Sequence, residues 1–281
     1  MRAWDDEECA TGAQRVTGLP SHTLGLPHLG AAGLGEEWFL REAGHRHWTG
    51  LAQLLGVEAQ HWVNERGDPL YATFVAAHLN GPLFAMARLG DTVTWDSTTL
   101  RHAAHLMVSS HTLRRQGDSA IARVMLASTF VARTSSGNHR FARHGMRKAQ
   151  PPVSSTGPVG ACVTRLLEAR RQSRSLLPNE QPDDHRLTIV PGEDFNAAGM
   201  VYFATMPRLL DRGEWYRAAA RDPSRRRLPL RPLLQRELFW YGNADAGDVV
   251  RVRHVGEEQV GVSALTRDDG TLMCIARTHR T

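Results

Sequence analysis

An internal repeat constrains the fold of this chain more than any other feature of its sequence. Three landmarks recur in the same order: Ala-Ala-Gly before an apolar segment (30–40 and 196–206), Gly-Asp before a second segment (89–95 and 246–252), and an apolar segment closing on Ala-Arg-Thr (130–134 and 274–278). One match alone would be chance, whereas an ordered set indicates two related units. We therefore expect two halves of the same design.

The repeat fits a chain of 281 residues, which is long enough for two ordinary domains. We predict a mobile tail at 1–25, an N-terminal domain at 26–149, a linker at 150–182 and a C-terminal domain at 183–281. The linker begins and ends rich in proline, and a short helix is expected within it, around 159–174.

Each half contains one expected helix followed by a run of expected strands. The helices should follow Gly33 and Gly199, the second one beginning at Met200. Strands rich in Val, Thr, Phe and Leu are expected at 70–79, 83–89, 92–100, 103–115 and 121–133, and again at 234–242, 248–256, 259–267 and 271–278. One helix followed by antiparallel strands favours a sheet curled around a central helix. The prediction is an α+β double hot-dog.

The composition is that of a globular protein, with 41% hydrophobic and 22% charged residues. No apolar run approaches the roughly 18 residues that span a bilayer, so we expect no membrane partner. The acidic N-terminus lacks an apolar stretch, which predicts no signal peptide. Cys9, Cys162 and Cys274 are odd in number and far apart, which predicts a reducing compartment without a disulfide framework. A cytoplasmic protein is therefore expected.

The formal net charge of +5 comes from basic residues that are nearly all arginine. They are spread out except in the stretch 221–237, where three prolines predict a loop followed by a strand. A nucleic-acid binder would carry a denser basic stripe with interleaved aromatics, so no nucleic-acid partner is expected. The Arg-rich loop is either a solvated surface or a docking site for an acidic carrier protein.

Several common catalytic motifs are absent from the sequence. It contains no GxSxG elbow, no Walker A loop, no HExxH and no paired CxxC. The pair His45 and His47 is expected near the end of the first helix, and the pair His102 and His105 in a strand without acidic or thiol neighbours. We therefore expect neither a metal nor a cofactor.

The glycine that precedes each expected helix is a candidate for binding an oxyanion, because free N–H groups gather at a helix N-terminus. Glu36 and Glu37 follow Gly33 and would neutralise that terminus. No acidic residue follows Gly199, so the second terminus is the better oxyanion site. The alternative is that Gly199 permits close packing and Asn196 caps the helix.

Four segments (27–48, 70–74, 193–207 and 239–253) resemble the double hot-dog acyltransferase/decarboxylases of polyketide biosynthesis, the leinamycin type. The resemblance covers most of residues 26–281. It implies an enzyme that decarboxylates malonyl- or methylmalonyl-CoA and transfers the acyl group to an acyl carrier protein. It also implies a key strand tyrosine, to which Tyr71 corresponds.

The catalytic candidates are Tyr71, Asn196 and Gly199, and the substrate-binding candidates are His28, Gly33 and Thr73. Tyr71 would donate a hydrogen bond to the enolate, or act as a nucleophile with a histidine base (His28, His61 or His111). We expect one active site between the halves.

Two other functions stay open. A hot-dog thioesterase or dehydratase normally needs an acidic residue or a histidine at the helix entry, where Asp194 and His28 are near. A non-catalytic module that binds acyl chains or a carrier protein is the third alternative.

Overall fold

The computed structural model describes residues 15–16, 21–81, 84–115, 120–135, 137–147, 152–153, 158–177, 179–181 and 184–281. Cys9 and most of the expected tail lie outside the described residues. Cys162 is disulfide-bonded, so the expectation of a chain without disulfides is wrong at this residue, and Cys274 is a buried free thiol. No helix in the described part of the chain is both long and apolar enough to cross a membrane.

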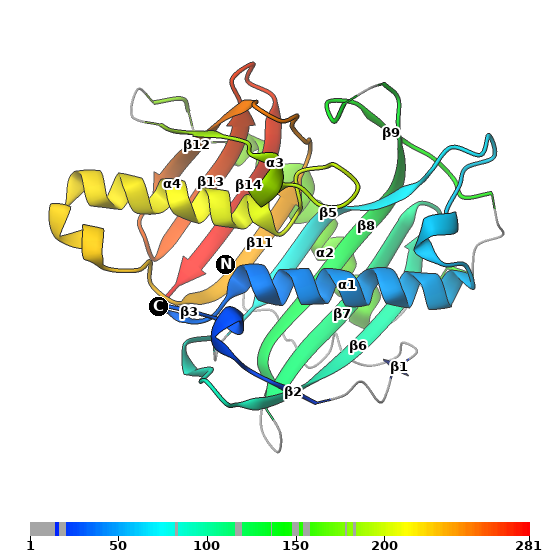
Figure 1. Cartoon of the computed structure of the whole chain (residues 1–281), viewed down its shortest axis with the longest axis horizontal. Helices are drawn as coiled ribbons and strands as arrows, with labels where there is room; N and C mark the ends of the chain where they lie inside the picture. Colours follow the sequence, from blue (N-terminus) through cyan, green and yellow to red (C-terminus); the bar gives the residue numbers. More distant parts are fainter. Residues whose placement is uncertain are drawn as a thin grey trace.

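One large antiparallel sheet runs through both halves of the molecule (Figure 1). Its strands are β1 (Arg15–Val16), β2 (His22–Thr23), β5 (Tyr71–Asn80), β6 (Thr92–Ala103), β7 (Leu106–Arg115), β8 (Ala120–Arg133), β9 (Phe141–Arg143), β10 (His185–Thr188), β11 (Leu233–Trp240), β12 (Val249–Gly256), β13 (Val260–Arg267) and β14 (Leu272–Arg280). A separate hairpin contains β3 (Leu29–Gly30) and β4 (Gly33–Leu34).

The strand order repeats between the halves. The first half runs β2-β6-β7-β8-β5 and the second runs β10-β12-β13-β14-β11, so each has the order 1-3-4-5-2. β5 and β11 pair in the middle and join the two units into one sheet. The second landmark lies at equivalent places: Gly90 (φ 87°) and Gly247 (φ 83°) precede the third strand of their halves. The predicted repeat is therefore present as a repeated topology.

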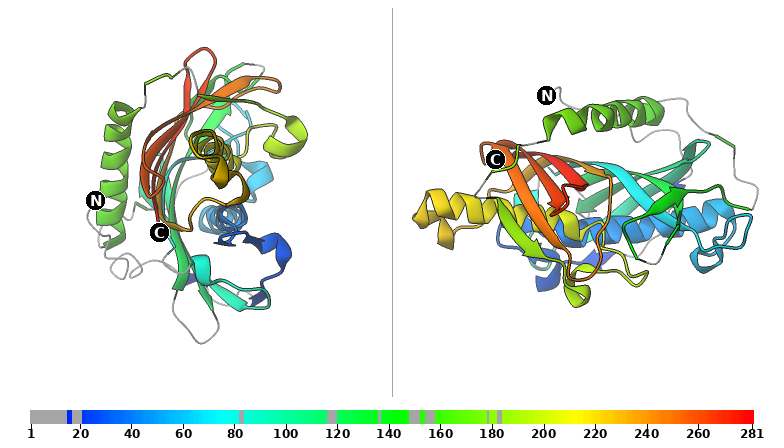
Figure 2. Two further views of the ribbon diagram at one scale, coloured as in Figure 1. Left: turned by 90° about the vertical axis from the view of Figure 1, so that its left-hand side faces the viewer. Right: turned by 90° about the horizontal axis from the view of Figure 1, so that it is seen from above.

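Two helices cover one face of the sheet and a third covers the other (Figure 2). The first two are α1 (Glu36–Leu55) and α4 (Thr205–Arg221), and the third is α2 (Pro158–Ser173), close to the helix expected in the linker. The short helices are α3 (Pro191–Asp194), η2 (Leu26–His28), η3 (Ala59–His61), η4 (Phe84–Met86), η5 (Arg174–Leu176) and η6 (Pro223–Arg227).

The helices α1 and α4 each pack closely on the sheet at a glycine. A Cβ atom at Gly50 of α1 would lie 2.2 Å from the Thr99 hydroxyl on β6, and one at Gly213 of α4 would lie 2.4 Å from Val252 on β12. β6 and β12 are the third strands of their halves, so the same close approach occurs twice. Any side chain at these glycines would push the helix away from the sheet. The two glycines therefore determine how closely each helix packs on the apolar core.

Most of the expected strands are confirmed, but four local expectations are wrong. Residues 84–86 form the 3-10 helix η4 where a strand was expected at 83–89. The helix expected from Met200 begins at Thr205. His47 lies in the middle of α1, fully buried, and not near its end. In the Arg-rich stretch 221–237 the expected strand is present as β11, but Pro223–Arg227 form the 3-10 helix η6 where a loop was expected.

Candidate active site

The sheet divides at the junction of the two halves. β5 and β11 are paired only as far as Ala76 and Phe239, and beyond these residues the two strands separate. Arg170 of α2 bridges the division: its Nε donates to the Val75 carbonyl (3.0 Å) and its Nη2 donates to the Trp240 carbonyl (3.1 Å). The Arg170 side chain therefore spans the gap between β5 and β11 and binds to both strands.

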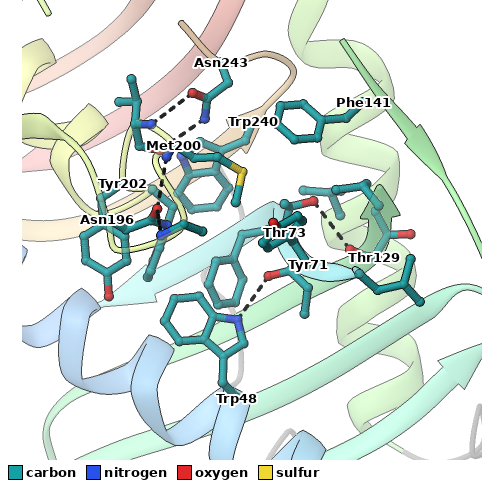
Figure 3. Close-up of a pocket in the computed structure, with 18 of the residues that line it drawn as sticks. Trp48, Tyr71, Thr73, Thr129, Phe141, Asn196, Met200, Tyr202, Trp240 and Asn243 are labelled. Atoms are coloured by element: carbon teal, nitrogen blue, oxygen red, sulfur yellow. Dashed lines mark hydrogen bonds between the residues drawn. The ribbon is translucent and has the colours of Figure 1, made fainter. Parts of the chain in front are cut away.

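A pocket of about 1190 Å³ occupies this division, lined by residues of both halves (Figure 3). Much of its wall is aromatic: Trp48, Trp62, Phe74, Tyr202, Phe203 and Trp240. The rings of Phe74 and Phe203 have centroids 4.2 Å apart, and those of Phe203 and Trp240 are 5.7 Å apart. A concave wall of this kind suits an apolar group of a ligand.

The pocket brings together Tyr71, Thr73 and Asn196, three of the six predicted site residues. Tyr71 begins β5 and lies beneath the guanidinium of Arg133, 5.4 Å from its ring centre. Its hydroxyl has no hydrogen-bond partner within the described part of the chain. Thr73 donates to the carbonyl of Thr129 at 3.4 Å. Tyr71 therefore offers the pocket a hydroxyl that is free to donate.

A second hydroxyl comes from Tyr202, also on the pocket wall. Burial raises the pKa of Tyr202 to about 12, which the nearby guanidinium of Arg41 only partly offsets. The Arg41 guanidinium lies 5.1 Å from the centre of the Tyr202 ring. At neutral pH this hydroxyl is a hydrogen-bond donor and not a base.

Asn196 and Asn243 shape the loop that precedes α4. Asn196 Oδ1 accepts from the N–H of Ala198 (3.0 Å) and of Met200 (3.1 Å), and Asn243 Oδ1 accepts from the N–H of Val201 (2.9 Å). These bonds hold the chain in a closed loop, which explains why the helix does not begin at Met200. No described residue accepts from Asn196 Nδ2, so this amide is a further donor for a ligand.

The expected oxyanion site at Gly199 has no free N–H group. Gly199 donates its own N–H to the Asn196 carbonyl (2.9 Å), and Tyr202 donates its N–H to the Asp194 carbonyl (2.7 Å). Together with the bonds to the two asparagines, every N–H from Ala198 to Tyr202 is used within the protein. Gly199 (φ 69°) permits the turn, and its own N–H is not available to a ligand.

His28 and Gly33 do not line the pocket. The His28 ring packs on Trp38 (centroids 4.8 Å apart), and its Nδ1 accepts from the N–H of Gly25 at 2.6 Å. Gly33 lies in the β3–β4 hairpin against the backbone of Phe84. Both residues therefore make packing contacts within the first half and are not part of the pocket.

The described residues of the pocket wall include no carboxylate, imidazole or thiol. Of the other suggested bases, His61 is exposed in η3 and His111 is fully buried in β7. No cluster of three His, Cys, Asp or Glu side chains that could hold a metal occurs among the described residues. The wall therefore supplies hydrogen-bond donors and positive charge, but no evident base.

A buried chain of hydroxyls and imidazoles lies under α1, and the sequence did not suggest it. It runs Ser97–His111–Ser109–His47–Ser128, with successive contacts of 2.9, 2.7, 2.6 and 2.7 Å. Burial lowers the pKa of His47 to about 3 and that of His111 well below its usual value, so both rings are neutral. The chain satisfies polar groups that the sheet would otherwise leave buried and unpaired.

Trp48, Arg170, Tyr202 and Asn243 also line the pocket, but were not among the predicted site residues. Tyr202 lies within the landmark 196–206 and Asn243 lies shortly before the landmark 246–252, so both stand near patterns that the sequence already singles out. Arg170 lies in the linker helix. No sequence pattern indicates that this helix reaches the junction of the halves.

No family model matches this sequence, and no curated protein sequence matches it. The structure is similar to an acyl-ACP thioesterase from Bacteroides thetaiotaomicron (TM-score 0.58, 9% identity, covering 93% of this chain and 96% of that one). It is also similar to the 12:0-ACP thioesterase from Umbellularia californica (0.60, 11%, 96% and 97%). A third similar structure comes from Lactobacillus plantarum, provisionally an oleoyl thioesterase (0.64, 11%, 97% and 97%). At these identities the likeness is one of fold, and the chain is an α+β double hot-dog.

Proposed function

We propose that the protein is an enzyme that acts on acyl thioesters and binds the acyl group in the pocket between its halves. The observation that carries the proposal is the pocket itself, which joins an aromatic wall to free donors at Tyr71 and Asn196. The three similar structures, which cover nearly the whole chain, bear names of thioesterases. A thioester needs an apolar site for its acyl group and donors for its carbonyl oxygen, and the pocket supplies both.

Hydrolysis is the reaction that the structural neighbours favour. The test is to incubate the purified protein with a panel of acyl-CoA and acyl-carrier-protein thioesters and to measure free thiol and free acid. Release of both in equal amounts, saturating with substrate, is the expected result. Binding without turnover of any thioester would replace the proposal with a non-catalytic acyl-binding module.

Decarboxylating acyl transfer is the second candidate, because the described wall lacks a carboxylate or imidazole to activate water. In this reaction the bond from the α-carbon to the carboxylate breaks, carbon dioxide leaves, and the electron pair forms a thioester enolate that takes a proton from water. The carrier-protein thiol then attacks the carbonyl, and CoA leaves as the free thiol. Stabilising the enolate requires donors in an apolar site and no metal.

The mass of the acyl group distinguishes the two candidates. With methylmalonyl-CoA and a holo carrier protein, decarboxylating transfer predicts a propionyl group on the carrier and an equal amount of carbon dioxide. Hydrolysis predicts free acid and an unmodified carrier. Intact methylmalonyl on the carrier would contradict the decarboxylating reaction.

A further inference from the structure

The pocket extends from one face of the sheet to the other, and its two ends differ in character. The end on the face of α1 and α4 is lined by Trp48, Tyr202 and Phe203. The end on the face of α2 is lined by Arg143 and Arg170. Because α2 and the pair α1 and α4 cover opposite faces (Figure 2), a ligand that fills the pocket passes through the division between β5 and β11.

Arg170 and Arg174 gather around one ring at the α2 end. Their guanidinium carbons lie 4.5 and 4.6 Å from the centre of the Tyr241 ring. The Tyr241 hydroxyl donates to the Arg170 carbonyl at 2.7 Å and lies 2.7 Å from the Ser173 hydroxyl. With the bonds of Arg170 to β5 and β11, these contacts fix its guanidinium before any ligand arrives.

The positive charge at this end is not compensated by the described part of the protein. No described carboxylate forms an ion pair with Arg143, Arg170 or Arg174. Arg143 and Arg170 line the same end of the pocket, and Arg170 and Arg174 flank the same ring. Burial, together with the positive charges of Arg143 and Arg174, lowers the pKa of Arg170. At the opposite end, by contrast, Arg41 is paired with Glu37 at 2.7 Å. Like charges held together without counter-ions favour the binding of an anion.

We propose that Arg143, Arg170 and Arg174 bind the phosphate of a phosphopantetheine arm, the group shared by coenzyme A and a holo carrier protein. The inference rests on the proposed function, and it assigns the α2 end as the entrance. The arm would thread through the division, carry its thioester to the donors, and place the acyl group against the aromatic wall. Guanidinium groups suit this role because their paired N–H groups match phosphate oxygens.

The test compares the binding of pantetheine and 4′-phosphopantetheine to the full chain by calorimetry. We expect the phosphorylated compound to bind at least tenfold more tightly, and the variants Arg143→Gln and Arg174→Gln each to reduce that preference severalfold while pantetheine itself binds as before. Both arginines are exposed, so their variants keep the fold. Arg171→Gln is the matched control: it removes an equal, exposed charge from α2, close in sequence to Arg174 but outside the cluster, and should leave the preference unchanged.

Coenzyme A and a holo carrier protein then distinguish the two sources of the arm. Loss of affinity for both in Arg174→Gln supports a shared phosphate site, and an equal loss in Arg171→Gln would mean a diffuse basic surface and overturn the proposal. Equal binding of pantetheine and 4′-phosphopantetheine by the unmodified protein would also overturn it. The readout is separate from turnover: a phosphate preference without catalysis contradicts the proposed function alone, and catalysis without a preference contradicts the anion site alone.

Discussion

At the scale of single residues, Gly33 holds a conformation that no other residue adopts without strain. Its φ is 114°, and a Cβ atom there would lie 2.2 Å from the carbonyl oxygen of Phe84. We predict that Gly33→Ala lowers the free energy of unfolding by about 2–4 kcal/mol, measured by urea denaturation. Gly30→Ala in the same hairpin is the control, since nothing lies within 4 Å of its Cβ position. An equal loss in both variants would contradict the packing explanation.

Tyr71 is the residue whose removal should affect the chemistry most selectively. Its hydroxyl is a free donor at the pocket, so Tyr71→Phe should lower kcat about 100-fold on whichever thioester is turned over, with KM changed less than threefold. Tyr216→Phe, on the surface of α4, should have no effect. Full activity in Tyr71→Phe would remove the tyrosine from the mechanism while leaving the pocket assignment intact.

At the scale of elements, the buried chain under α1 links stability to pH. The pKa of His47 falls from 6.5 to about 3 on folding, so below pH 6.5 the unfolded chain binds a proton that the folded chain does not. The contribution of His47 to the free energy of unfolding is therefore fully present above pH 6.5 and is lost as the pH falls toward 3. The expected loss from His47 alone is on the order of 2 kcal/mol at pH 5.

The measurement is the urea midpoint between pH 7.5 and 5. Replacing the two imidazoles of this chain (His47→Gln with His111→Gln) should reduce the pH dependence while lowering stability at pH 7.5. His45→Gln, at an exposed position of the same helix, should leave the dependence as it is. His78, whose pKa burial also lowers to about 3, keeps part of the slope in the double variant, so a slope as steep as that of the unmodified protein would falsify the assignment.

Most strands could be predicted from the sequence because alternation and turn residues are local signals. The two misplaced elements had local signals that tertiary contacts overrode. Within the apolar run expected at 83–89, Phe84–Met86 form η4, since Phe84 packs back against Gly81, where a Cβ atom would lie 1.9 Å from its ring. The apolar run at Met200 looks helical, but Asn243 takes the N–H of Val201 from a distant part of the chain.

At the scale of the molecule, the halves share one sheet and a buried ion cluster. Arg236 of β11, fully buried, donates to Glu36 of α1 at 2.7 Å and to Asp211 of α4 at 2.6 Å. Leu238 and Phe239, which pair with β5, are also fully buried. We predict that 183–281 expressed alone does not fold, because it exposes this strand and leaves Arg236 without its partner in the first half.

Circular dichroism with thermal melting checks this prediction. The isolated segment should show no cooperative transition, and adding the segment 1–182 should restore one. A cooperative transition in the isolated segment would mean that the second half is an independent domain. The proposed division at 149–150 and 182–183 stays a prediction until that experiment.

The sequence by itself determined the repeat, the class of fold and the strands, because these follow from patterns that recur within each half. It also singled out Tyr71, Thr73 and Asn196, which the structure brings to one pocket. Only the tertiary structure decided that Gly199 has no free N–H, that His28 and Gly33 lie elsewhere, and that Arg170 reaches the junction. Those outcomes depend on contacts between segments far apart in the chain, and no local pattern encodes which partner a backbone N–H or a guanidinium will meet.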